Sequence, residues 1–478
     1  MWIWKSGAMR QVVVVGGGVT GVAAAWLLRQ VGGPDLAVTV LESSPRLGGK
    51  LHTVELAGVD VDTGAEAILN RRPEGVELAR AVGLGERIRY AATTSAGLWS
   101  RGALHPIPGG TILGVPGDLA ALRESGLLSA DGLSRVEAEP DLPGAPLDED
   151  VAIGTYAAHR MGRELVDRLV EPLLGGVYAG RSDQLSLQAT VPALVPYLRE
   201  NPSLLRAAAR AKAATPASDA PVFAGLTGGV GGLVPAVAQA SGACVRTDTT
   251  VRELRRTSDG RWQLVVGPTR VPDLVDADAV VLACPARPAS RLLAEIAPAA
   301  AGELAGIEYA SMATIALAFP SSAVPGSLPG SGFLVPPVEG RLIKAATFSS
   351  AKWSWMAEDA PDVVIIRCSV GRLGDVTELQ RDDADLVAGA AADLRGLVGV
   401  RAQPIDAHVA RWGGGLPQYA VGHRARVARI RADLARQPGI AVAGAAYEGI
   451  GIPACIASAR SAVTQLLGAS HAPGTMTA

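Results

Sequence analysis

Short hydrophobic runs separated by glycine-rich and polar segments dominate the chain, and their spacing predicts alternating strands and helices. Val12–Val15 is an unbroken run of β-branched residues, the pattern of a strand buried on both faces of a parallel sheet. Val19–Gln30 is alanine-rich and amphipathic, which predicts a helix, and Leu36–Leu41 predicts a second strand. These elements form a βαβ unit of about 30 residues. The pattern therefore indicates an α/β fold.

Two later runs of the same kind return the chain to this sheet. Val280–Ala283 and Ile440–Ala443 each predict a buried strand, and a helix is expected over Pro453–Leu467. A glycine cluster at Gly225–Gly232 marks the point of return. Because buried parallel strands gather in one sheet, we expect a single discontinuous domain made of residues 9–72, 224–300 and 435–470.

The remaining segments predict two further units. Helical patterns over Val151–Leu174 and Asn201–Ala214, with Pro-Gly punctuation before them, indicate a mostly helical insertion. Strand-like runs at Thr314–Phe319 and Val363–Val370 indicate a second sheet. We therefore expect the insertion over residues 106–223 and an α+β substrate domain over residues 73–105 and 301–434.

Composition narrows the classes of function and location. At 478 residues the chain is long enough for two or three cores, and 48% hydrophobic with 19% charged residues is typical of globular proteins. A formal net charge of -2 gives no basic field to gather nucleic acid, so we expect no nucleic-acid partner. The four cysteines, Cys244, Cys284, Cys368 and Cys455, lack ligand spacing, so we expect neither disulfides nor structural zinc.

No segment predicts a membrane span or a metal site. The most apolar N-terminal stretch, Val12–Leu28, is short and interrupted by glycines. The six histidines show no H-x-x-x-H or E-x-x-H spacing. The leader Met1–Ala8 resembles an upstream extension, because Met9 stands where such a domain normally starts. We expect a cytoplasmic protein whose helical insertion offers a surface for peripheral contact with a membrane or with another enzyme.

The first turn carries the chemistry of a dinucleotide site. Gly16, Gly18 and Gly21 form G-x-G-x-x-G, which allows a tight turn, a close approach of backbone to a pyrophosphate, and packing of the helix on the sheet. Glu42 follows 21 residues after Gly21, at the end of the second strand, where a carboxylate accepts hydrogen bonds from ribose hydroxyls. The two features together predict a Rossmann-like dinucleotide-binding domain.

Adjacent motifs favour FAD over NAD. Arg46-Leu47-Gly48-Gly49-Lys50 resembles the second glycine motif of FAD proteins of the glutathione-reductase and p-hydroxybenzoate-hydroxylase type. Asp62-Thr63-Gly64-Ala65-Glu66 resembles the segment that passes the flavin. Together these blocks resemble the superfamily of flavin amine oxidases, phytoene desaturases and porphyrinogen oxidases.

Further blocks resemble the porphyrinogen oxidases in particular. They are His159-Arg160-Met161-Gly162 with Glu171-Pro172-Leu173 and Gly175–Gly180, then Leu226–Gly229, then Trp412 with Leu416–Tyr419 and Gly422-His423, and finally Gly444, Tyr447, Gly449, Gly451, Ile452 and Cys455. The resemblance extends over most of the chain. It implies an FAD oxidase of haem synthesis that takes hydride from a porphyrinogen and passes electrons to molecular oxygen.

The resemblance also implies roles for individual residues. It assigns FAD contacts to Gly16, Gly17, Gly18, Val19, Thr20, Gly21, Glu42, Ser43, Arg46, Gly49, Lys50, Gly64, Ala65, Glu66, Ala67, Val251, Trp412, Gly444, Ile450, Gly451 and Ile452. For Gly451 and Ile452 the pattern agrees, because they precede a helix whose N-terminal N–H groups are free to bind an anion.

The expected substrate site is a flat apolar slot with cations for the propionates. Gly175 and Gly176 lack side chains and would let a macrocycle approach the flavin, and Phe333, Leu334 and Phe348 fall in the segment that lines the slot in the family. For each of these, ordinary core packing is an equal alternative. The propionate candidates are Arg71, Arg72, Lys344 and Lys352, although surface cations of this kind are usually solvated.

The choice of substrate depends on two details. Near Ala96 the chain lacks the arginine that mitochondrial and plant relatives carry, and Lys352-Trp353 resembles the bacterial coproporphyrinogen branch. We therefore expect coproporphyrinogen III, with protoporphyrinogen IX as the alternative. An FAD amine oxidase or carotenoid desaturase shares the glycine motifs, but an amine oxidase needs an aromatic cage and aromatic residues are only 4%. Prenyl-Rab binding proteins reuse this fold without flavin chemistry, and a colourless purified protein would favour that reading.

Overall fold

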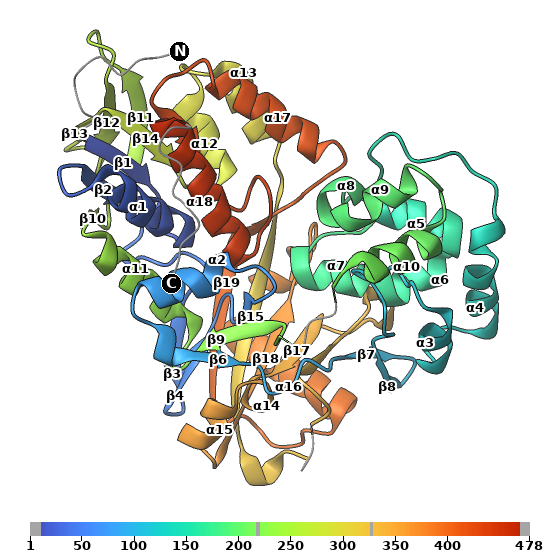
Figure 1. Cartoon of the computed structure of the whole chain (residues 1–478). Helices are drawn as coiled ribbons and strands as arrows, with labels where there is room; N and C mark the ends of the chain where they lie inside the picture. The colour runs from blue at the N-terminus through green and yellow to red at the C-terminus, as the bar shows by residue number, and fades with distance from the viewer. Residues whose placement is uncertain (1–10, 217–219, 326–327, 469–478) are drawn as a thin grey trace.

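The computed structural model describes residues 11–216, 220–325 and 328–468, so the leader Met1–Ala8 and Met9 lie outside the described residues. Figure 1 shows three lobes that meet at the centre of the molecule. The parallel-sheet lobe contains β1, β2, β10, β14, β20 and their helices. The seven-stranded lobe contains β7, β8 and β15–β19, and the helical lobe contains α3–α10.

The parallel-sheet lobe is built around five parallel strands in the order β10-β2-β1-β14-β20. Their bounds are Cys244–Arg246, Ala37–Leu41, Gln11–Val15, Ala279–Leu282 and Ile440–Val442. Val12 and Val14 pack toward one core and Val13 and Val15 toward another, because successive side chains of a strand point to opposite faces. The β-branched run is thus buried on both sides, as its composition predicts.

Helices and a small sheet cover the two faces of these strands. The first face is covered by α1 (Val19–Gly32), α11 (Leu233–Ser241) and α18 (Ile452–Leu467). The second face is covered by α12 (Ala286–Leu293), α13 (Pro298–Ala305), α17 (His423–Leu434) and the antiparallel strands β11 (Val251–Arg256), β12 (Trp262–Val266) and β13 (Asp273–Ala277).

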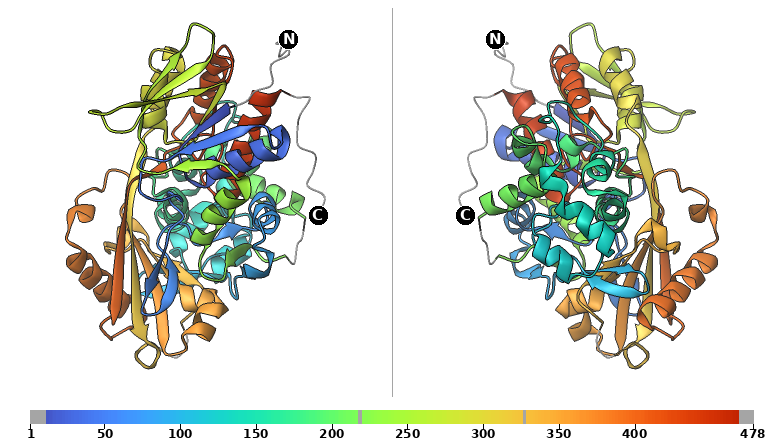
Figure 2. Two further views of the ribbon diagram at one scale, coloured as in Figure 1. Left: turned by 90° about the vertical axis from the view of Figure 1, so that its left-hand side faces the viewer. Right: turned by 90° about the vertical axis from the view of Figure 1, so that its right-hand side faces the viewer.

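The seven-stranded sheet has the order β19-β15-β18-β17-β16-β7-β8. The strands are Asp406–Pro417, Tyr309–Pro320, Val363–Val370, Ala345–Phe348, Gly332–Leu334, Gly97–Ser100 and Ala103–Pro106. Helix α16 (Asp383–Val398) covers one face. The two long strands β15 and β19 run side by side from the parallel-sheet lobe to the far end of the sheet (Figure 2).

One end of the opposite face of this sheet is covered by a hairpin and two short helices, and the other end, at Leu98 and Leu334, packs against the helical lobe. The hairpin of β3 (Thr53–Leu56) and β4 (Val59–Asp62) packs there with α14 (Ser349–Lys352) and α15 (Ser354–Asp359). A small sheet of β5 (Ile68–Leu69), β9 (Phe223–Leu226) and β6 (Ile88–Tyr90) lies next to them, and α2 (Glu74–Ala81) leads from β5 toward β6.

The helical lobe corrects one expectation. The single helix expected over 151–174 is interrupted: α5 (Ile153–Met161) ends at Gly162, whose φ of +93° favours glycine. After α6 (Arg163–Leu165) and a π-helical turn (Val166–Val170), α7 continues over Glu171–Tyr178. The other helices are α3 (Leu119–Glu124), α4 (Ala130–Glu137), α8 (Leu187–Thr190), α9 (Val195–Leu198) and α10 (Leu204–Ala214).

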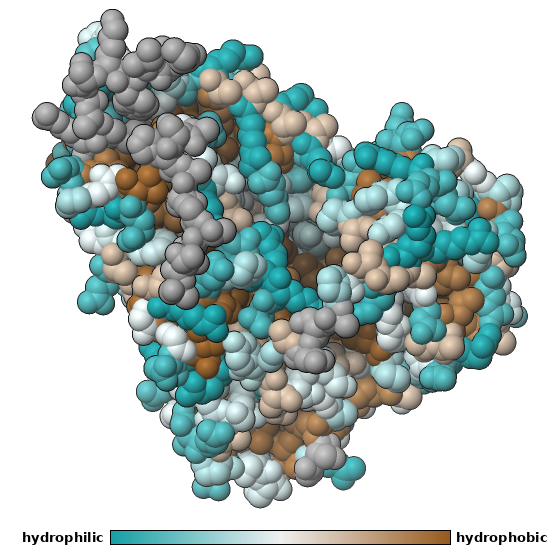
Figure 3. Space-filling view, viewed as in Figure 1, coloured by the Kyte–Doolittle hydropathy of each residue, from teal (hydrophilic) through white to brown (hydrophobic). Residues whose placement is uncertain are grey.

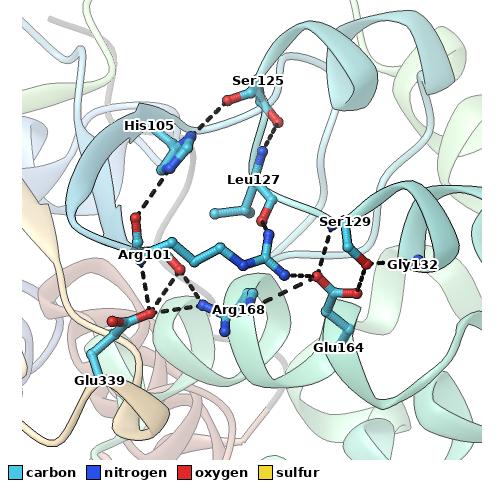
Figure 4. Close-up of polar contacts among 10 residues, drawn as sticks. Arg101, His105, Ser125, Leu127, Ser129, Gly132, Glu164, Arg168 and Glu339 are labelled. Atoms are coloured by element: carbon cyan, nitrogen blue, oxygen red, sulfur yellow. Dashed lines mark hydrogen bonds and ion pairs between the residues drawn. The ribbon is translucent and has the colours of Figure 1, made fainter.

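A polar network joins the helical lobe to the edge of the seven-stranded sheet (Figure 4). Arg101, in the β7–β8 turn, pairs with Glu164 and donates to the carbonyl of Leu127 at 3.0 Å. Arg168 of the π-helical turn donates to Glu339 at 2.7 Å. Because these contacts come from both lobes, they hold α7 at a fixed place over the sheet.

Candidate functional site

The glycine turn after β1 has two kinds of glycine. Gly16 has a φ of +111°, and a Cβ on Gly21 would overlap the carbonyl oxygen of Gly16, so both are required by the fold itself. A Cβ on Gly18 would meet no described atom within 4 Å. Gly18 therefore faces open space at the N-terminus of α1, where no side chain of the described residues caps the helix. This is the arrangement that a pyrophosphate requires.

Glu42 is held in place at the end of β2. Its carboxylate accepts hydrogen bonds from the backbone N–H of Gly17 at 2.7 Å and of Ser44 at 2.8 Å. Its backbone N–H donates to the carbonyl of Arg246, and its own carbonyl accepts from Thr249, which places the start of β11 with Val251 nearby. The carboxylate thus borders the glycine turn, where a ribose would lie next to a pyrophosphate.

The second glycine segment folds against the first. Gly48 donates to the carbonyl of Gly17 at 2.9 Å. Arg46 donates to the carbonyl of Gly49 at 2.9 Å, so its guanidinium stabilises its own loop. Burial lowers the pKa of Lys50, which lies near Cys455 at the start of α18. Residues expected to share one cofactor are therefore brought together.

The closing segment adds a second helix N-terminus. Gly444, with a φ of +132°, follows β20 and donates to the hydroxyl of Ser458 at 3.0 Å. Gly451 precedes α18, whose N-terminus has no side-chain cap within the described residues. Strands β1 and β20 run parallel in one sheet, so α1 and α18, which follow their carboxyl ends, begin on the same side of the lobe. Free N–H donors, open glycine backbone and a fixed carboxylate fit FAD.

The segment from Asp62 to Ala67 is anchored by side chains from distant parts of the chain. The carboxylate of Asp62 accepts from Val230 at 2.7 Å and from Thr53 at 2.6 Å. Trp412 of β19 donates its indole N–H to the carbonyl of Thr63 at 3.0 Å. Trp412 is thus placed by a bond to the segment that is expected to pass the flavin.

Glu66 is the centre of a buried network. Its carboxylate accepts from Ser349 at 2.8 Å and from the indole of Trp353 at 3.0 Å, and it pairs with Arg367 at 2.7 Å and Lys352 at 3.4 Å. Burial alone would raise the pKa of Glu66, but the two cations and the hydrogen bonds outweigh burial and lower the pKa to about 2. The side chain of Glu66 therefore anchors its segment.

Arg367 of β18 links this network to the sheet. One guanidinium nitrogen pairs with Glu66, and another donates to the carbonyl of Gly64 at 2.7 Å. Sequence reasoning missed Arg367, although a signal was present. It is the one charged residue in the hydrophobic run Val363–Val370, and a charge buried in the middle of a strand needs a specific partner.

The expected slot is bounded by α7 and by the strands of the seven-stranded sheet next to it. A Cβ on Gly176 would lie 3.3 Å from the side chain of Leu334, and Leu334 pairs across the sheet with Ala345 and then Ser369. These three residues are half-buried in the middle of a sheet whose other face is closed by α16. Figure 3 shows a hollow with an apolar base where the three lobes meet.

The other predicted substrate residues lie elsewhere. Phe333 and Phe348 are buried with their ring centroids 5.8 Å apart in the core under α16, so their rings do not line the face of Leu334. Arg71 is exposed between β5 and α2. Lys352 is paired with Glu66. Lys344 is buried, and its ammonium has no hydrogen-bond partner in the described part of the chain.

Neither a metal nor a membrane-spanning helix is indicated. Among the described residues, no three His, Cys, Asp or Glu side chains are grouped as metal ligands. No helix in the described ranges combines the length and hydropathy that are needed to cross a bilayer.

Comparisons with known proteins agree with this geometry. The profile of the family "Flavin containing amine oxidoreductase" matches residues 19–467. The coproporphyrinogen III oxidase of Mycobacterium tuberculosis (strain ATCC 25618 / H37Rv) is 38% identical over 470 residues, covering 97% of this chain and 98% of the relative. The coproporphyrinogen III oxidase of Bacillus subtilis (strain 168) is 31% identical over 473 residues, covering 97% and 99%.

A solved structure extends the similarity to three dimensions. A protein from Exiguobacterium sp. 255-15, provisionally assigned as a protoporphyrinogen oxidase, superposes with a TM-score of 0.83 at 32% identity, covering 96% of this chain and 99% of that chain. These matches confirm the expected flavoprotein fold, the oxidoreductase class, FAD as the cofactor and the resemblance to porphyrinogen oxidases.

Proposed function

Because the chain belongs to the family of flavin-containing amine oxidoreductases, we propose that it is an oxygen-dependent FAD oxidase that converts coproporphyrinogen III into coproporphyrin III in haem synthesis. The conversion removes six electrons in three two-electron steps, and in each step one oxygen molecule is reduced to hydrogen peroxide. The nearly full-length similarity to proteins named coproporphyrinogen III oxidase carries the proposal.

Each part of the chain has a defined task in this reaction. Bound FAD supplies a hydride acceptor for a methylene carbon of the substrate. The N-termini of α1 and α18 bind the pyrophosphate through free N–H groups, and Glu42 binds the ribose. Gly176 and Leu334 lie side by side, so that together they would form one wall against which a flat ring could lie.

The proposal also covers the partners of the enzyme and its location in the cell. Its partners are the porphyrinogen, molecular oxygen and, in transient contact, the enzyme that takes the product. A cytoplasmic location is supported by four cysteines that are free thiols. Peripheral membrane contact through the helical lobe belongs to the same proposal.

The decisive experiment is anaerobic reduction of the bound flavin. Coproporphyrinogen III is expected to bleach flavin absorbance, and readmitted oxygen is expected to restore the absorbance and release peroxide. Gly176→Leu should slow the reduction at least tenfold, because its side chain enters the space beside Leu334. Gly302→Leu is the matched control, since Gly302 is an exposed helix position with no described atom within 4 Å of a Cβ. A flavin that stays oxidised with coproporphyrinogen III would refute the function.

A further inference from the structure

The loop between β20 and α18 is braced at two points by one side chain. The hydroxyl of Tyr419 donates to the carbonyl of Ala445 at 2.7 Å and accepts from the backbone N–H of Gly449 at 2.7 Å. We call residues 445–449 the closing loop, because they connect the end of β20 to the start of α18. A single hydroxyl thus fixes both ends of the closing loop.

His423, the first residue of α17, braces the middle of the closing loop. Its Nε2 lies 3.0 Å from the carbonyl of Tyr447, and because a carbonyl oxygen only accepts, Nε2 carries the proton. Burial lowers the pKa of His423, so the imidazole is neutral at pH 7. Its ring stacks on that of Tyr419, with centroids 3.9 Å apart and 13° between the planes. The two side chains therefore support the closing loop as one unit.

The same segment holds the end of α7, which carries the expected wall of the slot. Gln418 donates its amide N–H to the carbonyl of Tyr178, the last residue of α7, at 2.8 Å. The rings of Tyr178 and Tyr419 pack with their centroids 5.6 Å apart. Gly176 lies in the last turn of this helix. Residues 418–423 thus contact α7 as well as the closing loop.

These contacts lie inside the protein. Tyr419 is 2% exposed, and Gln418 and His423 are each 3% exposed. A buried backbone N–H or carbonyl that loses its partner costs free energy, because water does not replace the lost bond. Tyr419 also belongs to the core of the helical lobe, and Ile450, which follows the closing loop, packs against that core. The position of the closing loop therefore depends on the hydroxyl of Tyr419.

We propose that Tyr419, supported by His423, is a positioning residue that holds the closing loop, and with it the N-terminus of α18, in a fixed relation to α7. The inference rests on the proposed function and deepens it. Gly444 and residues 450–452, on either side of the closing loop, are expected to contact FAD, and α7 is expected to contact the substrate. Hydride transfer requires the reacting atoms to be close and aligned. The tyrosine serves that alignment by supporting the cofactor loop and the slot wall together.

The test removes the hydroxyl alone from the full chain. Tyr419→Phe keeps both ring contacts and loses both hydrogen bonds to the closing loop. We expect the FAD-free variant to bind FAD about tenfold more weakly in a fluorescence titration, which is about 1.4 kcal/mol. With FAD and coproporphyrinogen III both saturating, its anaerobic flavin reduction in a stopped-flow instrument should be about tenfold slower than in the wild type.

Two further variants complete the test. Tyr156→Phe is the matched control, because its hydroxyl donates to the carbonyl of Pro202 at 2.8 Å within the helical lobe, and it should leave the FAD affinity and the reduction rate unchanged. His423→Phe keeps a ring against Tyr419 but has no N–H for the carbonyl of Tyr447. It should weaken FAD binding and slow the reduction in the same direction as Tyr419→Phe.

The reduction rate at full FAD occupancy decides the result. A wild-type rate in Tyr419→Phe overturns the inference, even if the variant unfolds at a lower urea concentration or binds FAD more weakly, because the hydroxyl is then only structural. An equal loss of rate in Tyr156→Phe also overturns it. If Tyr419→Phe fails to fold, His423→Phe decides by the same rate. A wild type whose flavin is reduced by neither porphyrinogen refutes the proposed function, and the FAD titration alone then tests whether Tyr419 holds the closing loop.

Discussion

Replacing Glu66 by glutamine tests whether the flavin segment is anchored by charge. The substitution keeps the shape but removes the negative charge that Arg367 and Lys352 share, and leaves two cations in a site where Glu66 is only 7% exposed. The pKa of Glu66, lowered from 4.5 to about 2, corresponds to about 3 kcal/mol of stabilisation of the folded state. Loss of one partner of a buried pair generally costs about 3–5 kcal/mol, which agrees.

The assay is urea unfolding at neutral pH, with and without saturating FAD. Glu66→Gln should lower the free energy of unfolding by about 3 kcal/mol in both conditions, because the anchor exists before the cofactor binds. Glu55→Gln is the matched control on the exposed side of β3. Unfolding of Glu66→Gln at the same urea concentration as the control would refute the argument.

The same anchor predicts a direction of pH dependence. The folded-state pKa of Glu66 lies below its unfolded value, so the stabilisation is complete above pH 4.5 and is lost as the pH falls toward 2. The difference in unfolding free energy between wild type and Glu66→Gln should therefore narrow over that window. A difference that stays constant from pH 6 to pH 3 would show that the carboxylate charge is not what holds the segment.

Two further predictions concern backbone space and a buried ion pair. Gly18→Val should fold with wild-type stability, since a Cβ at this position meets no described atom, but the protein should lose its flavin absorbance. Gly21→Ala should lower the free energy of unfolding by about 1–3 kcal/mol, because the new Cβ overlaps the carbonyl oxygen of Gly16. A yellow Gly18→Val protein would contradict the pyrophosphate assignment. Arg160→Met should lower the free energy of unfolding in urea by about 3–5 kcal/mol, because it leaves the fully buried carboxylate of Glu139 without its cation. Arg163→Met, at an exposed ion pair, should lower it by less than about 1 kcal/mol. Equal losses in the two variants would contradict the reasoning.

Much of the parallel-sheet lobe could be predicted from local patterns in the sequence. The run Val12–Val15 and the glycines after it specify a strand, a turn and a helix within about 30 residues, and the structure has all three. The break at Gly162 was missed because helix-forming residues stand on both sides of it, and only the positive φ of the glycine ends α5. Local propensity does not report such a conformation, since tertiary packing selects it.

The residues of the expected substrate site were harder to predict, because the residues that contact one another there are far apart in the sequence. Phe333 and Leu334 are neighbours in one strand, so they must point to opposite faces and cannot both line the slot. The sequence alone establishes that alternation. It does not establish which of the two side chains points into the slot. Lys352 pairs with Glu66, which lies 286 positions away in the sequence, and no pattern within either segment predicts this pair.

The contacts that anchor residues 62–67, the segment expected to pass the flavin, would fix the position of the cofactor relative to the slot. Arg367 and Trp412 come from β18 and β19, the two strands that flank β15, and they bind the neighbouring carbonyls of Gly64 and Thr63. The same strand β18 also carries Ser369 at the slot. Under the proposed function, these contacts would hold the flavin segment at a fixed place relative to the sheet. A sheet is stiff along its strands, and hydride transfer requires reacting atoms to be held close and aligned. Under the proposed function, Arg367 and Trp412 would therefore be positioning residues for that alignment.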